Sequence, residues 1–162
     1  MSPRWEPNPD IRTGRHCVHD LSAHLVFVTK YRRDALTSPM LERCEQIMKE
    51  VCEKFDCELT EFNGEHDHVH LLVRYPPKVA LSSLVNSLKG VSARYLRQEY
   101  SAHVRTHLWS GHFWSRSYYA GSTGDANEAT VHTYIQSQDR NETRPDAATT
   151  GSKARVRARS GP

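Results

Sequence analysis

One short stretch, residues 66–73 (HDHVHLLV), constrains the fold more than any other part of the chain. If it is a β-strand, its side chains alternate between two faces with a period of two. One face is then apolar and consists of Val69, Leu71 and Val73. The other face carries three histidines, His66, His68 and His70. The pattern predicts a sheet with one face packed on a hydrophobic core and histidines on the opposite, open face.

Histidines on one strand face offer ligands for a metal ion. Neighbouring side chains on one face lie about 7 Å apart, so the imidazoles of His68 and His70 can lean onto a single ion. Imidazole is a common ligand of divalent metals, and two ligands leave positions open, as a catalytic site requires. A histidine-rich surface strand without a metal is the alternative, and this stretch alone does not decide between the two.

Length and composition indicate one ordinary globular domain. The chain has 162 residues, of which 25% are charged and 37% hydrophobic, enough for one core and too few for two comfortable domains. No apolar run approaches the ~20 residues of a membrane span, and the first ten residues lack a signal-peptide pattern. We therefore expect a cytoplasmic protein without a membrane partner.

Charge and cysteine content narrow the function classes further. The formal net charge is +3, but Lys153, Arg155, Arg157 and Arg159 near the C-terminus carry four positive charges, so the rest of the chain has a net charge of −1. If the chain binds nucleic acid, it must therefore do so through a local basic patch. The four cysteines lack CxxC spacing and are expected to be free thiols. A zinc site that combines Cys52 and Cys57 with histidines is a minor alternative.

Hydrophobic periodicity and turn residues predict the order of elements. Strands are expected at 21–29, 57–63, 66–73 and 108–119, and helices at 39–55, 80–100 and 126–138. This order is the split βαβ, ferredoxin-like pattern of an α+β fold: a four-stranded antiparallel sheet with two helices on one face, to which the last helix is added. Residues 1–20 are expected to form an extended or mobile arm, 21–138 the domain, and 139–162 a polar, basic, disordered tail.

The segment before the last helix and the helix itself carry further signals. Residues 121–124 (GSTG) form a flexible break, and Asp125 with Glu128 resembles a capping box. Tyr134 and Gln138 are four residues apart and share one helix face. If this helix docks across the open sheet face, both would meet the histidine pair and complete a nucleophilic phosphoryl-transfer site. The alternative is that Tyr134 packs as an ordinary aromatic residue and Gln138 is a surface residue.

Basic residues occur in two places that suit contacts with a phosphate backbone. The candidates are Lys30, Arg32 and Arg33 after the first strand, and Lys89 and Arg94 on the second helix. A cationic helix face is also common as a simple solvated surface, so charge alone leaves this function open.

Together these pieces resemble a known family. The triplet at 68–70 is similar to the His–hydrophobic–His signature of HUH endonucleases, and the chain from 21 to 138 resembles the single-tyrosine, TnpA-like transposases of small insertion sequences of the IS-two-hundred type. Repeat-associated tyrosine transposases are near relatives. The matching segments are HLVFVTKYRR (24–33), GEHDHVHLLV (64–73), LVNSLKGVSARYLRQEY (84–100), LWS (108–110), SYYAGS (117–122) and YIQSQ (134–138).

The resemblance implies a DNA transposase that cuts and rejoins single-stranded DNA at element ends through a 5′-phosphotyrosine intermediate. It implies that His68, His70 and Gln138 bind Mg2+ or Mn2+ and that Tyr134 is the nucleophile. It also implies a homodimer in which the histidine pair of one subunit meets the tyrosine helix of the other, with hairpin-containing DNA as partner and 121–124 as a plausible hinge. A non-catalytic single-strand-binding module on the same fold and a hydrolase that uses activated water are the competing interpretations.

Overall fold

The computed structural model describes residues 11–14, 16–108, 111–122 and 128–142. Its centre is an antiparallel sheet of β3 (Ser22–Val28), β4 (Glu58–Gly64), β5 (His68–Arg74) and β6 (Tyr119–Ser122). The strand order is β4-β5-β3-β6, so the two central strands, β5 and β3, are not consecutive in the chain. This topology confirms the predicted ferredoxin-like fold.

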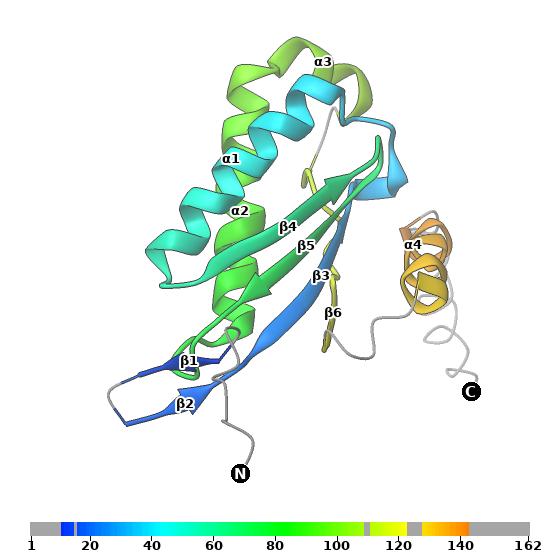
Figure 1. The fold of residues 1–162 in the computed structure, drawn as a ribbon. Coiled ribbons are helices and arrows are strands. Elements are labelled where there is room, and N and C mark those ends of the chain that lie inside the picture. Colours follow the sequence, from blue (N-terminus) through cyan, green and yellow to red (C-terminus); the bar gives the residue numbers. More distant parts are fainter. Residues whose placement is uncertain (1–10, 15, 109–110, 123–127, 143–162) are drawn as a thin grey trace, which may run out of the picture.

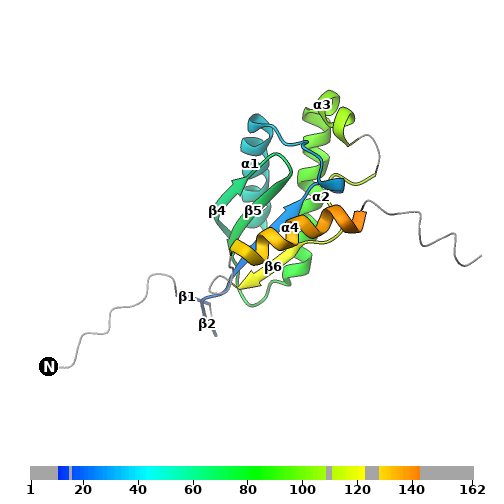
Figure 2. The same ribbon diagram turned by 90° about the vertical axis from the view of Figure 1, so that its right-hand side faces the viewer.

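Helices cover the two sheet faces unequally. The helices α1 (Ser38–Lys54) and α2 (Leu81–Glu99) pack on one face, and α3 (Ser101–His107) follows α2. The helix α4 (Glu128–Glu142) lies on the opposite face (Figures 1 and 2). α1 begins after Thr37, whose side chain accepts a hydrogen bond from the Met40 amide, as an N-cap residue does.

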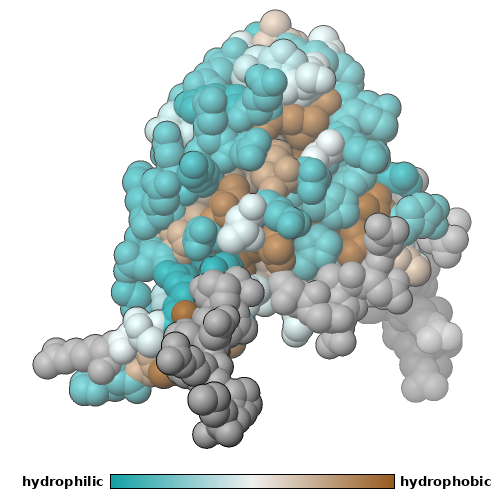
Figure 3. All heavy atoms as spheres, in the orientation of Figure 1, coloured by the Kyte–Doolittle hydropathy of each residue, from teal (hydrophilic) through white to brown (hydrophobic). Residues whose placement is uncertain are grey.

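The alternation in the histidine strand produces the expected core. Val69, Leu71 and Val73 are fully buried beneath α1 and α2, together with Leu25 and Phe27 of β3. A second, smaller cluster on the other face joins Val26 and Val28 to Val131 and Ile135 of α4. Most of the outer surface visible in Figure 3 is hydrophilic, with hydrophobic side chains showing between the polar ones. Among the described residues, no helix is long and apolar enough to cross a membrane.

The predicted strand over 108–119 is wrong. Of the residues that the structure describes in this region, only β6, from Tyr119 to Ser122, belongs to the sheet. Residues 111–118, which precede β6, pair with the sheet at one isolated bridge, between Thr29 and Trp114. The Lys89 ammonium group donates hydrogen bonds to the carbonyl oxygens of Ser115, Arg116 and Ser117, at 2.6, 3.3 and 3.3 Å. These carbonyls therefore bind a side chain of α2 instead of a neighbouring strand.

Other boundaries also differ from the predictions. Part of the N-terminal arm forms a small sheet of β1 (Arg12–Thr13) and β2 (Val18–His19), and α3 has no predicted counterpart. Two residues of the predicted break at 121–124 lie in β6, while Thr123, Gly124 and the Asp125 cap fall outside the described residues. α4 continues to Glu142, beyond the predicted end at Gln138.

The cysteines are free thiols, as predicted. Cys44, Cys52 and Cys57 are buried, and burial raises the pKa of Cys44 and of Cys52 to about 12. Neutral thiols of this kind are poor metal ligands, because a metal binds the thiolate, which weighs against the zinc alternative.

Candidate active site

A cavity of about 810 Å³ lies between the open sheet face and α4. Strands β3 and β5 contribute His24, His68 and His70 to its wall, and the segment between β4 and β5 contributes Glu65, His66 and Asp67. Helix α4 closes one side with Val131, His132 and Ile135. The two histidines predicted as metal ligands therefore face the same cavity.

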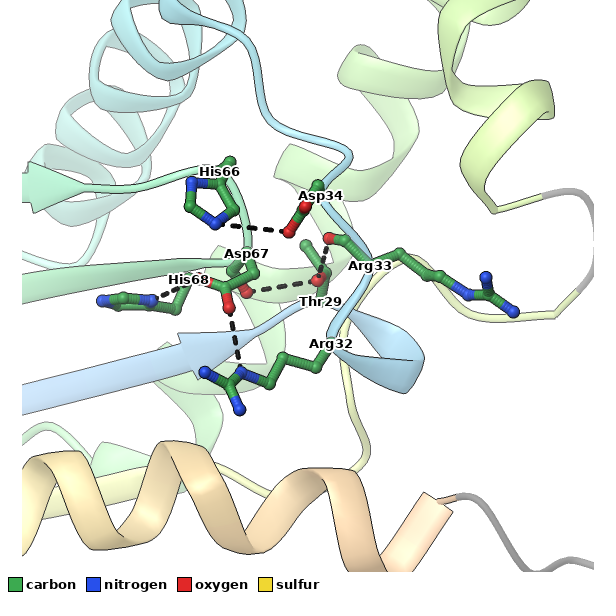
Figure 4. A network of polar contacts seen from close by, with 7 residues as sticks. All are labelled: Thr29, Arg32, Arg33, Asp34, His66, Asp67 and His68. Atoms are coloured by element: carbon green, nitrogen blue, oxygen red, sulfur yellow. Dashed lines mark hydrogen bonds and ion pairs between the residues drawn. The ribbon is translucent and has the colours of Figure 1, made fainter.

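His68 is held by an ionised carboxylate. Its Nδ1 lies 2.6 Å from Asp67 Oδ1, and Asp67 Oδ2 accepts a hydrogen bond from Arg32 Nε at 3.0 Å (Figure 4). Burial alone would raise the pKa of Asp67, but the hydrogen bonds from His68 and Arg32 more than offset it and lower the pKa to about 2. A carboxylate only accepts, so Nδ1 carries the proton of this hydrogen bond, and in a neutral ring this leaves the lone pair on Nε2.

The chain positions Arg32 by an unusual backbone turn. The 3-10 segment Lys30–Arg32 has left-handed conformations at Tyr31 (φ 58°) and Arg32 (φ 52°), which cost about 1–3 kcal/mol each in a residue with a side chain. Thr29 fixes this turn to the site, since its hydroxyl donates to the carbonyl oxygens of Arg33 (2.6 Å) and Asp67 (3.1 Å). This strained turn directs the Arg32 side chain toward Asp67.

His70 has a partner that the sequence did not reveal. Its Nδ1 lies 3.3 Å from Nε2 of His24 on β3, and the ring centroids of His70 and His68 are 4.8 Å apart. Burial, followed by the charges of His68 and His24, lowers the pKa of His70 to about 4. His70 is therefore neutral near pH 7, which is the form that binds metals.

Acidic residues at the rim extend the set of possible ligands. Two groups have ligand atoms within 4.8 Å of one another: Asp34, His66 and Asp67, and Glu65, Asp67 and His68. His66 Nε2 also lies 3.3 Å from Asp34 Oδ1. A mixed set of imidazoles and carboxylates suits a divalent cation, so the residues present fit such an ion, although they do not identify the metal.

Tyr134 and Gln138 occupy a different part of the structure. The Tyr134 hydroxyl lies 2.8 Å from Ser117 Oγ, and Gln138 Oε1 accepts hydrogen bonds from Ser115 (2.8 Å) and Ser117 (2.9 Å). Gln138 is only 4% exposed, and neither residue lines the cavity. The structure thus brings His68 to His70 and Tyr134 to Gln138, but within one chain it does not bring the two pairs together at the cavity.

The five basic residues predicted to contact DNA also lie in two separate parts of the structure. Arg32 lines the cavity and pairs with Asp67, and the Lys30 ammonium group lies 5.2 Å from the Tyr31 ring centroid. The Arg33 side chain points away from the histidines (Figure 4). Lys89 and Arg94 belong to α2 on the other sheet face, where Lys89 binds the carbonyls of 115–117 and Arg94 lies over the Tyr95 ring.

Curated relatives of this chain are transposases. It is 30% identical over 129 residues to the ISDra2 transposase TnpA of Deinococcus radiodurans, covering 80% of this chain and 91% of that protein. It is also 30% identical over 129 residues to the transposase for insertion sequence element IS200 of Salmonella typhimurium, covering 80% and 84% of the two chains.

Solved structures with a similar fold point the same way. A putative transposase from Deinococcus radiodurans matches with a TM-score of 0.73 at 28% identity, over 78% of this chain and 97% of that chain. A REP-associated tyrosine transposase bound to a REP hairpin matches with a TM-score of 0.50 at 11% identity, over 76% and 67%, which shows a likeness of fold alone.

The family described as "Transposase IS200 like" matches residues 17–138, most of the chain. Membership implies a DNA-cleaving transposase with a general requirement for a divalent metal. This chain therefore belongs to the IS200-like transposase family, which confirms the family predicted from its sequence.

Proposed function

We propose that this transposase cuts and rejoins single-stranded DNA by transesterification, with Tyr134 as the nucleophile and a 5′-phosphotyrosine as the intermediate. The observation that carries the proposal is the open-face cavity, in which two neighbouring histidines present ligand nitrogens beneath the helix that bears Tyr134. The family membership of the chain supports the same conclusion.

The chain's own groups divide the chemistry between them. Asp67 orients His68, and a neutral His70 stands beside it. Mg2+ or Mn2+ bound by His68, His70 and Gln138 would polarise the scissile phosphate and offset developing charge. Tyr134 gives up its hydroxyl proton and its oxygen attacks phosphorus, while the 3′-oxygen of the neighbouring nucleotide leaves and takes up a proton. The 5′-phosphate stays on the tyrosine. Because the phosphodiester is conserved, a later 3′-hydroxyl can reverse the step without ATP.

The separation of the two residue pairs supports a site shared within a homodimer. Tyr134 and Gln138 do not line the cavity of their own chain. Residues 123–127 connect β6 to α4. The apolar contact between α4 and the sheet is small: Val131 and Ile135 pack on Val26 and Val28, with Tyr119 and Tyr134 partly buried beside them. We propose that α4 of one subunit serves the histidine cavity of the other.

Single-stranded DNA with hairpins at the element ends is the proposed substrate. One relative in fold is described as bound to a REP hairpin, and a tyrosine on a docked helix needs a phosphate in a flexible strand. Lys30, Arg32 and Arg33 near the cavity are the proposed backbone contacts. The two other basic candidates, Lys89 and Arg94, lie on α2 across the sheet, and Lys89 already binds the carbonyls of 115–117, so any contact that they make with DNA lies outside the cavity. Binding should weaken as salt rises, because phosphate contacts release counterions.

Covalent capture tests the proposal. A 5′-fluorescent and a 3′-fluorescent single-stranded element end are each incubated with the protein and Mn2+ and run on a denaturing gel. We expect a protein-sized labelled band with the 3′-label only, and none with a fully paired duplex. Tyr134→Phe should lose the band, whereas the control Tyr118→Phe, which removes a tyrosine hydroxyl on the side of the main core, should keep it.

Two other results would point to the competing functions. Cleavage that survives Tyr134→Phe without a covalent band would indicate a hydrolase that uses activated water. Binding of the labelled strand without cleavage or adduct under any metal condition would indicate a non-catalytic single-strand-binding module.

A further inference from the structure

His24 lies at the centre of the site but has no role in the function proposed above. It is on β3, where its backbone partner in β5 is Leu72, while His70 is opposite Val26. His24 and His70 are therefore diagonal neighbours on the open face, close enough for two rings to touch. Their ring centroids are 5.5 Å apart, with 29° between the ring planes, and His24 Nε2 lies 3.3 Å from His70 Nδ1.

The other side of the His24 ring is also fixed. The Tyr119 ring of β6 meets it edge-on, with centroids 6.2 Å apart. Gly121 lies opposite His24 in the ladder between β3 and β6, and a Cβ at Gly121 would come within 2.6 Å of the Tyr119 hydroxyl. The missing side chain at Gly121 leaves room for Tyr119, so the His24 ring is held between Tyr119 and His70.

His68 and His70, the two histidines predicted as metal ligands, each have a partner at Nδ1. His68 Nδ1 is bound to Asp67, and His70 Nδ1 faces His24. A metal-binding histidine usually donates its other N–H to a partner, which fixes the tautomer and the ring orientation. Asp67 does this for His68, and the position of His24 is the corresponding one for His70.

We propose that His24 is a positioning residue whose Nε2 accepts a hydrogen bond from the Nδ1–H of His70 and so leaves His70 Nε2 to face the metal. The inference rests on the proposed function in that His70 is taken as a ligand. The reverse hydrogen bond, from His24 to His70, would place the His70 proton on Nε2 and block it as a ligand. Of the two neutral arrangements, only donation by His70 leaves its Nε2 free.

The tautomer can be measured without metal, DNA or catalysis. In protein labelled with 15N at histidine and kept in chelator at pH 7.5, the nitrogen shifts of His70 should show the proton on Nδ1. A proton on His70 Nε2 would overturn the proposal, whatever the protein does to DNA. Loss of covalent capture with the predicted tautomer intact would instead count against the proposed function alone.

Variants of His24 add a metal-binding readout. In Mn2+ titrations followed by electron paramagnetic resonance, His24→Leu should raise the dissociation constant for Mn2+ by about 10–100-fold, the usual effect of losing such a partner. His24→Gln offers an amide oxygen as acceptor and should restore binding to within about threefold of wild type. His107→Leu, on α3 across the sheet, controls for the loss of a histidine as such. Equal Mn2+ affinity of wild type and His24→Leu would contradict the proposal.

Direct ligation by His24 is the competing arrangement, because an ion held between the two nitrogens would also fit a separation of 3.3 Å. Diamagnetic Zn2+ distinguishes them through the 15N shifts. We expect metal binding at Nε2 of His70 and an unligated His24. Metal-induced shifts at His24 Nε2 and His70 Nδ1 would show that His24 is a ligand and overturn its positioning role.

Discussion

The histidine half and the tyrosine half of this site are built in different ways. His68 and His70 lie on a central strand whose reverse face is fully buried, and Asp67, Arg32 and Thr29 tie the strand end to the turn after β3. Tyr134 and Gln138 lie on a helix attached to the sheet through a small apolar cluster, the ring contact of Tyr134 with Tyr119, and hydrogen bonds to Ser115 and Ser117. The histidine half is therefore preorganised, whereas Tyr134, the proposed nucleophile, lies on an element with few attachments, the kind that opens most easily.

The largest effect should come from the rigid half. His68→Ala or His70→Ala should reduce single-strand cleavage by about 10³-fold or more, because each removes a ligand of the proposed metal site. Because the His70 side chain faces away from the main core, His70→Ala should change unfolding by urea by less than about 1 kcal/mol. His68→Ala also removes the hydrogen bond to Asp67 and should cost about 1–3 kcal/mol. Leu71→Ala, on the core face of the same strand, is the matched opposite and should cost about 2–5 kcal/mol. Full cleavage by the double histidine variant in chelator would contradict the site.

The rigid half should also govern stability in acid. In metal-free protein the pKa of His70 is lowered from 6.5 to about 4, first by burial and then by the charges of His68 and His24. The unfolded chain takes up this proton at higher pH than the folded one, so the free energy of unfolding falls as pH decreases from 6.5 to 4. For a partly exposed ring we expect about 2 kcal/mol. His70→Gln should flatten urea-derived stability between pH 7 and 4.5, and an unchanged slope would refute this contribution.

A second loss should follow at lower pH. Asp67 has a pKa lowered from 3.8 to about 2, because the hydrogen bonds from His68 and Arg32 outweigh burial. Its carboxylate stabilises the fold above pH 3.8, and this stabilisation, about 2 kcal/mol, is lost as pH falls toward 2. Asp67→Asn should remove the loss of stability between pH 3.8 and 2 while leaving the loss that His70 causes between pH 6.5 and 4. If the loss below pH 3.8 persists in this variant, other carboxylates cause it.

The smallest effect is expected in the tyrosine half. Ser117→Ala removes hydrogen bonds to Tyr134 and Gln138, worth about 1 kcal/mol. Amide exchange in α4 should accelerate about fivefold, with β5 unchanged, whereas Ser122→Ala at the exposed end of β6 should alter neither. Equal acceleration in α4 and β5 would show that the two halves open together, and the contrast between them would fail.

Sequence reasoning succeeded where a local pattern determines the structure. The alternation of His68, Val69 and His70 predicted both faces of β5 and, with the order of elements, the ferredoxin-like sheet. It failed where distant residues decide. The aromatic run before Tyr119 has high β propensity, but Lys89 of α2 binds its carbonyls. His24 could not be placed beside His70 without knowing the register between β3 and β5.

The same limit applies to the α4 residues. Spacing correctly put Tyr134 and Gln138 on one helix face, and both interact with Ser117. Periodicity does not fix how a helix is rotated on a sheet, and here Val131 and Ile135 occupy the contact with β3. The roles of Tyr134, Gln138 and the histidine pair in catalysis remain predictions.

Mixing two inactive variants tests most directly whether the halves meet across a dimer. Tyr134→Phe and the double variant His68→Ala/His70→Ala should each be inactive alone. After subunit exchange, verified with tags of different size, one site of each heterodimer combines intact histidines from one chain with the intact tyrosine of the other. The account predicts that cleavage of a labelled single strand returns to about a quarter of the wild-type level, since half of the dimers then carry one complete site of two. No recovery despite proven exchange would show that Tyr134 serves the histidines of its own chain, and would contradict the shared site.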